Sequence, residues 1–152
     1  EGLALSQGSL FIGLRAPNIR GNALMMEMDP TTLFDQGETK PTLHQAAVGL
    51  GRGIREISAL NQGFLLLTGN ASAEASQKFP QSEALGPDDH FEILYWHPNE
   101  KNRTHLLAAL PSNGGKAEGL LVMKESTAGV EVLVLFDSIA DGAPTIFRLP
   151  LP

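Results

Sequence analysis

The sequence Glu1-Gly2-Leu3 opens the chain, returns as Glu118-Gly119-Leu120 near its end, and has a looser copy, Arg55-Glu56-Ile57, between the two. Each copy begins the same series: a short apolar stretch, a turn with Gly or Asn, a strongly apolar stretch and an abrupt change to polar residues. Self-similarity at a spacing of roughly 50–65 residues is the signature of a repeat architecture. Because each unit reads as a small antiparallel sheet, the repeat predicts the blades of a β-propeller.

Short apolar runs bounded by Gly, Asn, Asp and Pro account for most of the chain, and helical periodicity is scarce. These runs predict the following strands: Leu3–Leu5, Leu10–Leu14, Ala23–Met28, Thr42–Val48, Ile54–Leu60, Phe64–Thr68, Phe91–Trp96, Thr104–Leu110, Gly119–Lys124, Val132–Phe136 and Thr145–Leu149. We therefore expect an all-β chain of about three four-stranded antiparallel blades, at residues 1–50, 51–112 and 113–152. The third blade lacks its outer strand.

Two connections stand out in this prediction. Asp29-Pro30 ends the third strand, and a polar turn through Gly37 leads to the fourth. A longer connection runs from about Gly69 to Asp89, with small and polar residues and two prolines. Its length exceeds the usual connection and is typical of functional or disordered loops.

The second strands of the later units, Phe64–Leu67 and Val132–Phe136, are apolar throughout. Strands that are buried on both faces have this character, as a blade between two neighbouring blades would. A β-sandwich remains an alternative, because short strands at even spacing also suit that fold.

Three blades cannot close a ring, since propellers typically have four to eight. The chain begins at Glu1 without Met and ends at Pro152 directly after a strand. We expect a fragment of a larger ring of six to seven blades, with the remaining blades in the full-length chain. Alternatively, two copies associate as a homodimer whose halves complete a six-bladed ring with two-fold symmetry.

Composition narrows the choice of partners. The net charge of -6 and the pI near 5.1 argue against nucleic acid or an anionic membrane surface as a partner. The chain has no cysteine, so it has neither a disulfide framework nor a thiolate metal site. No stretch approaches the ~18 apolar residues of a membrane span. This composition suits the bacterial cytoplasm and the bacterial periplasm equally.

Charged and polar residues are expected to gather on one face of the predicted propeller. The connections between fourth and first strands and between second and third strands meet on that face, near the mouth of the central channel. They carry Glu1, Arg15, Arg20, Arg52, Arg55, Glu56, Thr68, Asn70, Lys116, Glu118, Asp137 and Asp141. The opposite hairpins, such as Ser6–Ser9 and Asn61–Gly63, carry almost no charge.

This polar face has three interpretations. Arginines can hold a carboxylate or phosphate through paired hydrogen bonds, and the candidate ligand-binding residues are Arg15, Arg20, Arg52, Arg55 and Asn70. Calcium takes six to eight oxygen ligands, and the candidate metal ligands are Glu1, Glu118 and Asp137. The structural interpretation is that each Glu pairs with an Arg of the next blade, and the balance of both signs at equivalent repeat positions favours it.

The histidines weigh against catalysis. His44 and His105 fall on predicted outer strands, His97 ends a third strand, and His90 lies at the close of the long connection. No Ser–His–Asp arrangement can be assembled at the channel from these residues. We therefore assign no catalytic residue, and the prediction leans away from an enzyme.

Several segments resemble a bacterial family of uncharacterised function whose members are predicted to be propellers. They are Glu1–Ala4, Leu10–Pro17, Gly51–Glu56, Ala117–Leu120 and Val132–Asp137, and the resemblance covers nearly the whole chain. Its most specific motifs are Gly-Leu-Arg-Ala-Pro and Gly-Arg-Gly-Ile-Arg. The Glu-Gly-Leu opening is also similar to that of phytase-like esterase propellers and related calcium-associated propellers. The nearer family implies the fold but no reaction, and the wider group implies calcium or phosphoester chemistry.

Three functions follow as hypotheses. The first is a propeller module whose polar channel face binds a small anionic ligand or a protein partner. The second is a calcium-dependent hydrolase of phosphoesters or lactones. The third is a purely structural scaffold.

Overall fold

The structure is a computed structural model that describes residues 1–37, 40–71, 90–111 and 114–152. Within these ranges the predicted all-β fold is confirmed, since eleven strands form three antiparallel sheets. The first sheet consists of β1 (Gly2–Ser6), β2 (Ser9–Gly13), β3 (Asn22–Met28) and β4 (Thr42–Ala47). The second consists of β5 (Arg52–Ala59), β6 (Phe64–Asn70), β7 (Glu92–Trp96) and β8 (Thr104–Ala109). The third consists of β9 (Lys116–Ser126), β10 (Gly129–Asp137) and β11 (Thr145–Leu149).

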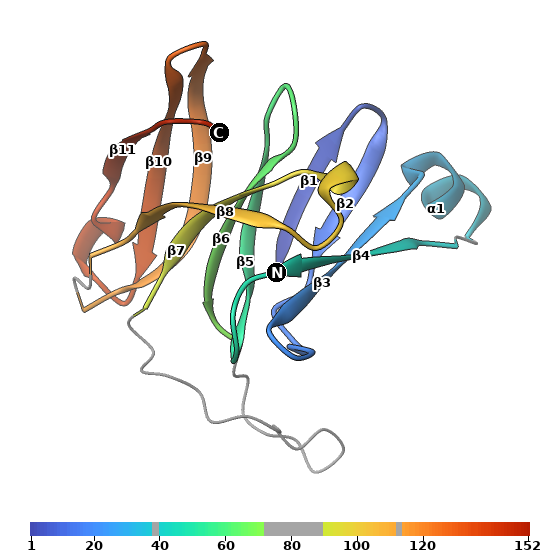
Figure 1. Ribbon diagram of the computed structural model, residues 1–152, viewed down its shortest axis with the longest axis horizontal. Coiled ribbons are helices and arrows are strands. Elements are labelled where there is room, and N and C mark those ends of the chain that lie inside the picture. Colours follow the sequence, from blue (N-terminus) through green and yellow to red (C-terminus); the bar gives the residue numbers. More distant parts are fainter. Residues whose placement is uncertain (38–39, 72–89, 112–113) are drawn as a thin grey trace.

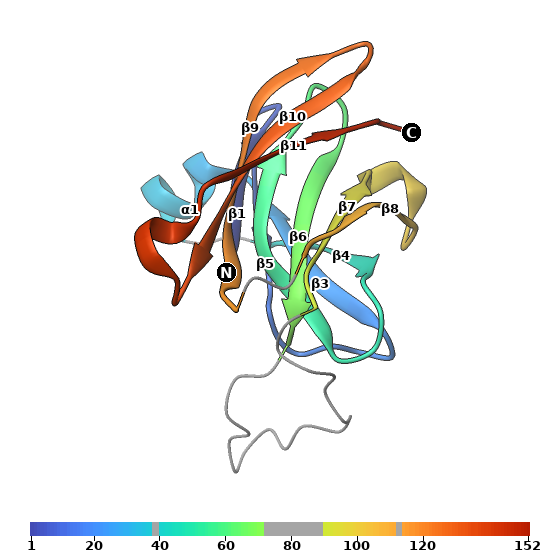
Figure 2. The same ribbon diagram turned by 90° about the vertical axis from the view of Figure 1, so that its left-hand side faces the viewer.

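Each sheet follows chain order from its first strand to its last, and the first strands lie next to one another. Strand β1 contacts β5, and β5 contacts β9. Figure 1 shows the hairpins β1–β2, β5–β6 and β9–β10 side by side, with their turns at one end and the starts of their first strands at the other. In the view along this row, β9 and β10 lie in front of β5 and β6 (Figure 2). Three sheets in a row are not the two-sheet sandwich that the sequence left open.

The middle sheet is buried on both faces. Leu66 and Trp96 contribute to a core shared with the first sheet. Leu67 and Ile93 contribute to a core shared with the third sheet. The prediction that Phe64–Leu67 is buried on both faces is therefore confirmed.

The same prediction is wrong for β10. Val132, Val134 and Phe136 face the second sheet and are buried, whereas Leu133 and Leu135 point to the other side and are partly or largely exposed. The reason is that, among the described residues, no further sheet lies against this side of the third sheet.

Two glycines allow the first and second sheets to approach closely. A Cβ atom on Gly2 would lie 2.7 Å from Ile57 Cγ1, and one on Gly13 would lie 2.6 Å from Ile54 Cγ2. Such distances are too short for any real side chain, so Ile54 and Ile57 occupy the space that these two residues leave empty. In the first copy of the Glu-Gly-Leu motif, the Gly is thus required by the packing of the two sheets.

A short helix was missed by the sequence analysis. The segment predicted as a polar turn before β4 forms α1 (Pro30–Gln36). The Asp29 carboxylate accepts from the backbone N–H of Thr31 and Thr32, Pro30 occupies the first turn, and Gly37 ends the helix with a φ of 68°. An Asp-Pro start and a Gly stop are helix-end signals, but seven residues are too few for a recognisable apolar period.

Smaller boundary differences bear on the site. Strand β6 continues to Asn70, so Gly69 and Asn70 lie in a strand and the predicted connection begins later. The remainder of that connection, residues 72–89, lies outside the described residues. Among the described residues, no helix is long and apolar enough to cross a membrane.

Candidate functional site

The predicted polar face corresponds to the end of the molecule where β1, β5 and β9 begin and β2, β6 and β10 end (Figure 1). Five of the predicted residues interact there: Glu1, Arg15, Arg55, Asn70 and Glu118. We call these five residues the polar cluster. They come from all three sheets, so the clustering depends on the way the sheets stand next to one another.

Arg55 is the most buried member of the polar cluster. Its side chain is 0% exposed and lies over the Phe91 ring, with Cζ 5.2 Å from the ring centroid. A register shift between Ile54 and Glu56 makes Arg55 an extra residue in β5. Such bulges re-aim a side chain. Gly69 leaves room for it, because a Cβ there would lie 2.7 Å from both Arg55 Nε and Phe91 Cδ1.

One nitrogen of Arg55 is paired and two are not. Nη1 donates to Glu118 Oε1 over 2.5 Å, which joins β5 of the second sheet to β9 of the third. Nε and Nη2 are buried and have no hydrogen-bond partner in the described structure. A guanidinium stays charged at any ordinary pH, and leaving its buried donors unsatisfied costs free energy. The fold therefore holds two unused charged donors in a fixed orientation.

Arg15 and Glu1 form a second ion pair beside the first. Arg15 Nη1 donates to Glu1 Oε1 over 2.9 Å, and Arg15 Nε donates to the backbone oxygen of Asn70 over 3.2 Å. The first contact stays within the first sheet, and the second joins the first sheet to the second. The prediction was that each Glu pairs with an Arg of the next unit. Arg55–Glu118 does join two neighbouring units, with the Arg on the preceding one, whereas Glu1 pairs within its own unit. Arg15 lies just beyond β2, close enough to satisfy the carboxylate of its own sheet.

The charges of the polar cluster act on one another through Glu118. Burial raises the pKa of the Glu118 carboxyl above its usual value of 4.5, and the neighbouring carboxylates of Glu1 and Asp137 raise it further, whereas Arg55 and Arg15 lower it. Acids and bases from the three sheets thus share one electrostatic environment. The net effect is a carboxyl that is easier to protonate than an ordinary glutamate.

The other predicted ligand-binding residues lie outside the polar cluster. Arg52 forms an ion pair with Glu92 within the second sheet. Arg20 is exposed on the connection between β2 and β3, and its side chain makes no hydrogen bond or ion pair with the described residues. Thr68, which was predicted for the polar face but not as a ligand-binding residue, is fully buried in β6 and donates to the backbone oxygen of Glu92.

The carboxylates of the three predicted calcium ligands influence one another electrostatically, but they do not form a recognisable metal centre. Asp137 accepts from the backbone N–H of Ser138 over 2.7 Å, while Glu1 and Glu118 each accept from an arginine. Among the described residues, no three His, Asp or Glu side chains form a group that could hold a metal ion. The calcium site stays a prediction.

Three of the four histidines have local partners away from the polar cluster. His44 lies 2.8 Å from Glu27 on the neighbouring strand, and His105 lies 3.1 Å from Glu100. The ring of His97 accepts from Asn99 at the start of a short 3₁₀ turn, Pro98–Glu100. These three histidines therefore make local contacts within the outer strands and turns.

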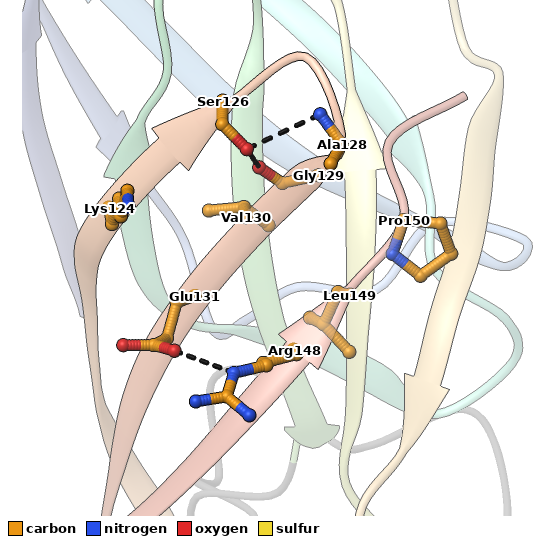
Figure 3. A pocket seen from close by; sticks show the side chains of 9 residues that line it. All are labelled: Lys124, Ser126, Ala128, Gly129, Val130, Glu131, Arg148, Leu149 and Pro150. Atoms are coloured by element: carbon orange, nitrogen blue, oxygen red, sulfur yellow. Dashed lines mark hydrogen bonds and ion pairs between the residues drawn. The ribbon is translucent and has the colours of Figure 1, made fainter.

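A shallow pocket of about 430 Å³ lies at the opposite end of the third sheet, by the β9–β10 hairpin (Figure 3). Lys124, Glu131 and Arg148 contribute its charges, and Arg148 Nε donates to Glu131 over 2.8 Å. The prediction that the opposite end carries almost no charge does not extend to this hairpin. None of the predicted site residues lines the pocket.

Sequence reasoning missed the neighbours that make the polar cluster possible. Phe91 and Gly69 surround the Arg55 guanidinium, and Glu92 pairs with Arg52. The sequence predicts only that a strand starts at Phe91 and a loop at about Gly69. No signal in the sequence marks the bulge at Arg55 that brings them together.

The fold and the site define the class of this protein as an all-β chain of three adjacent antiparallel sheets with a polar cluster at one end. A family model described as "Protein of unknown function (DUF3616)" matches residues 1–144, and the chain belongs to this family. The predicted resemblance to a family of uncharacterised function is confirmed to that extent. No curated protein and no solved structure matches the chain.

Proposed function

We propose that the three sheets are consecutive blades of a β-propeller, and that the polar cluster binds a small anion, a carboxylate or a phosphate, at the mouth of its channel. Two features support the blade arrangement. The first strands are neighbours, and every sheet runs in chain order away from them. In a propeller the first strand of each blade lines the axis, so the polar cluster would face the channel.

A single observation carries the anion-binding proposal: Arg55 is fully buried and keeps two N–H donors unused. Donors of a planar guanidinium suit the two oxygens of a carboxylate or phosphate group. Phe91 and Glu118 hold this guanidinium in place. Because its two unused nitrogens are buried, binding requires a neighbouring side chain to move aside before an anion reaches them. Arg15 supplies a second positive charge beside the guanidinium.

The test is isothermal titration calorimetry of the folded chain with inorganic phosphate, citrate and acetate. We expect one of these probes to bind, and Arg55→Lys to weaken binding by about tenfold or more because an ammonium cannot offer paired donors. The matched control is Arg148→Lys, which alters an 83% exposed arginine at the other end of the third sheet. Arg15→Gln provides a second variant if Arg55→Lys does not fold. Absence of binding by all three probes would refute the proposal.

A structural scaffold is the second candidate, because the contacts of the polar cluster join neighbouring sheets. Arg55–Glu118 connects the second and third sheets, and Arg15 with the Asn70 backbone connects the first and second. In this case Arg55→Lys lowers the melting temperature, and no anion raises it. An anion that binds only the folded chain must raise the melting temperature with concentration, so the same titration followed by melting separates the two candidates.

No contact among the described residues favours a calcium-dependent hydrolase over these two functions.

A further inference from the structure

The first sheet has an apolar side that none of the described residues covers. One row of paired residues crosses all four strands: Leu3, Ile12, Met26 and Leu43. Leu3, Leu5 and Leu43 are among the most exposed large apolar side chains of the chain. We call this side the first open face.

The third sheet has a similar side that points away from the second sheet. Its paired row is Leu121, Leu133 and Ile146 across β9, β10 and β11. Met123 and Leu135 also lie exposed on the third sheet, beside this row. We call this side the third open face. Exposed apolar patches of this kind mark interaction sites in soluble proteins.

The repeat indicates that the first open face corresponds to the side of a sheet that packs on the sheet before it. Leu3, Ile57 and Leu120 hold the same place in the three copies of the motif. Ile57 and Leu120 pack against the preceding sheet and are buried, at 3% and 7% exposure, whereas Leu3 is 59% exposed. By its place in the repeat, Leu3 is therefore expected to pack against a preceding sheet, as Ile57 and Leu120 do.

The seat for such a side chain is present on the third open face. Gly2 and Gly119 occupy the same place in the motif, and Gly2 lies directly beneath Ile57. The three nearest atoms to a Cβ on Gly119 all belong to Leu135 of its own sheet, the closest at 3.2 Å. Nothing from a following sheet occupies that position in the described structure.

We propose that a second copy of the chain covers both faces, with the first open face of each copy packed on the third open face of the other. Leu3 of one copy then seats beside Gly119 and Leu135 of its partner copy. Two equivalent interfaces related by a two-fold axis close the pair, so both open faces are covered and neither is left for further growth. This inference rests on the blade arrangement proposed above and is independent of anion binding.

The mass of the chain in solution tests this inference. Size-exclusion chromatography with light scattering and sedimentation velocity, over a wide range of protein concentrations without added anions, should give twice the 16.2 kDa of one chain. Leu3→Glu should shift the mass to one chain, because it places a carboxylate in the apolar interface. The matched control is Leu106→Glu, since Leu106 is 60% exposed on β8 and lies on neither open face. This control should leave the mass unchanged.

Gly119→Ala tests the seat itself. The added methyl group occupies the space proposed for Leu3 of the second copy, and we expect it to raise the dimer dissociation constant about tenfold, equivalent to about 1.4 kcal/mol. Far-UV circular dichroism confirms that each variant is folded.

Three results would overturn the inference: a single-chain mass at every concentration, a dimer unaffected by both Leu3→Glu and Gly119→Ala, or an open series of larger species. If the Leu3→Glu variant still binds the anion, anion binding does not depend on the association of two copies, and each proposal can be tested without the other.

Discussion

Leu67 in β6 and Leu135 in β10 occupy the same place in their sheets, yet their surroundings differ completely. Each pairs with the middle residue of the repeated motif, Glu56 for Leu67 and Gly119 for Leu135. Leu67 is 0% exposed because the third sheet covers it, and Leu135 is 44% exposed. The comparison shows that an apolar strand can be buried on both faces, but whether it is buried depends on the presence of a neighbouring sheet.

The largest expected difference is in stability. Leu67→Ala should lower the free energy of unfolding by about 2–5 kcal/mol, because it leaves a cavity in a closely packed core. Leu135→Ala should lower it by less than about 1 kcal/mol in the single chain, because Leu135 is already 44% exposed and no neighbouring sheet covers it among the described residues. Urea unfolding of both variants in the Leu3→Glu background measures this without any contribution from dimers. Equal losses would mean that the third open face is already covered within one chain.

The equivalent glycines sharpen the same comparison with a smaller effect. Gly2→Ala places a methyl group 2.7 Å from Ile57 and should lower the free energy of unfolding by about 1–3 kcal/mol through overpacking. The nearest atom to the methyl group of Gly119→Ala is Leu135 Cβ at 3.2 Å, a looser contact than that at Gly2, and the substitution should cost a few tenths of that in the single chain. Thermal unfolding at low protein concentration measures both. A larger loss for Gly119→Ala than for Gly2→Ala would contradict the assignment of covered and open sides.

Much of the fold could be predicted because the repeat and the apolar runs are local in sequence. The strands were located to within a few residues, since Gly, Asn, Asp and Pro interrupt the chain at every turn. The helix α1 was missed because about two turns carry too few apolar positions to show a period. The exposed side of Val132–Phe136 was missed because burial depends on a neighbour that the strand itself does not specify.

The polar cluster could be predicted only in outline. The motif placed Glu1, Arg55 and Glu118 at the starts of first strands, and adjacent sheets bring strand starts together. Which acid pairs with which base depends on detail that sequence spacing does not contain. The bulge at Arg55 turns that side chain toward Glu118, and the position of Arg15 beyond β2 lets it reach Glu1.

The smallest expected effect concerns pH and the contact between the second and third sheets. Burial and the carboxylates of Glu1 and Asp137 raise the pKa of Glu118 above 4.5 in the folded chain. The folded chain therefore binds this proton more tightly than the unfolded chain does. It follows that the contribution of Glu118 to the free energy of unfolding must decrease as the pH rises from about 4.5 through the raised pKa.

Glu118→Gln removes this titration and keeps an oxygen that can accept from Arg55. We expect the stability of the variant to improve relative to that of the unmodified chain as the pH rises through this window, and to run parallel to it at higher pH. Urea unfolding at a series of pH values measures the difference. The control is Glu131→Gln, which alters an ion pair within the third sheet and leaves Glu118 in place, so the decrease should persist. If the decrease also persists in Glu118→Gln, another group is responsible and the polar cluster does not link the stability of the two sheets to pH.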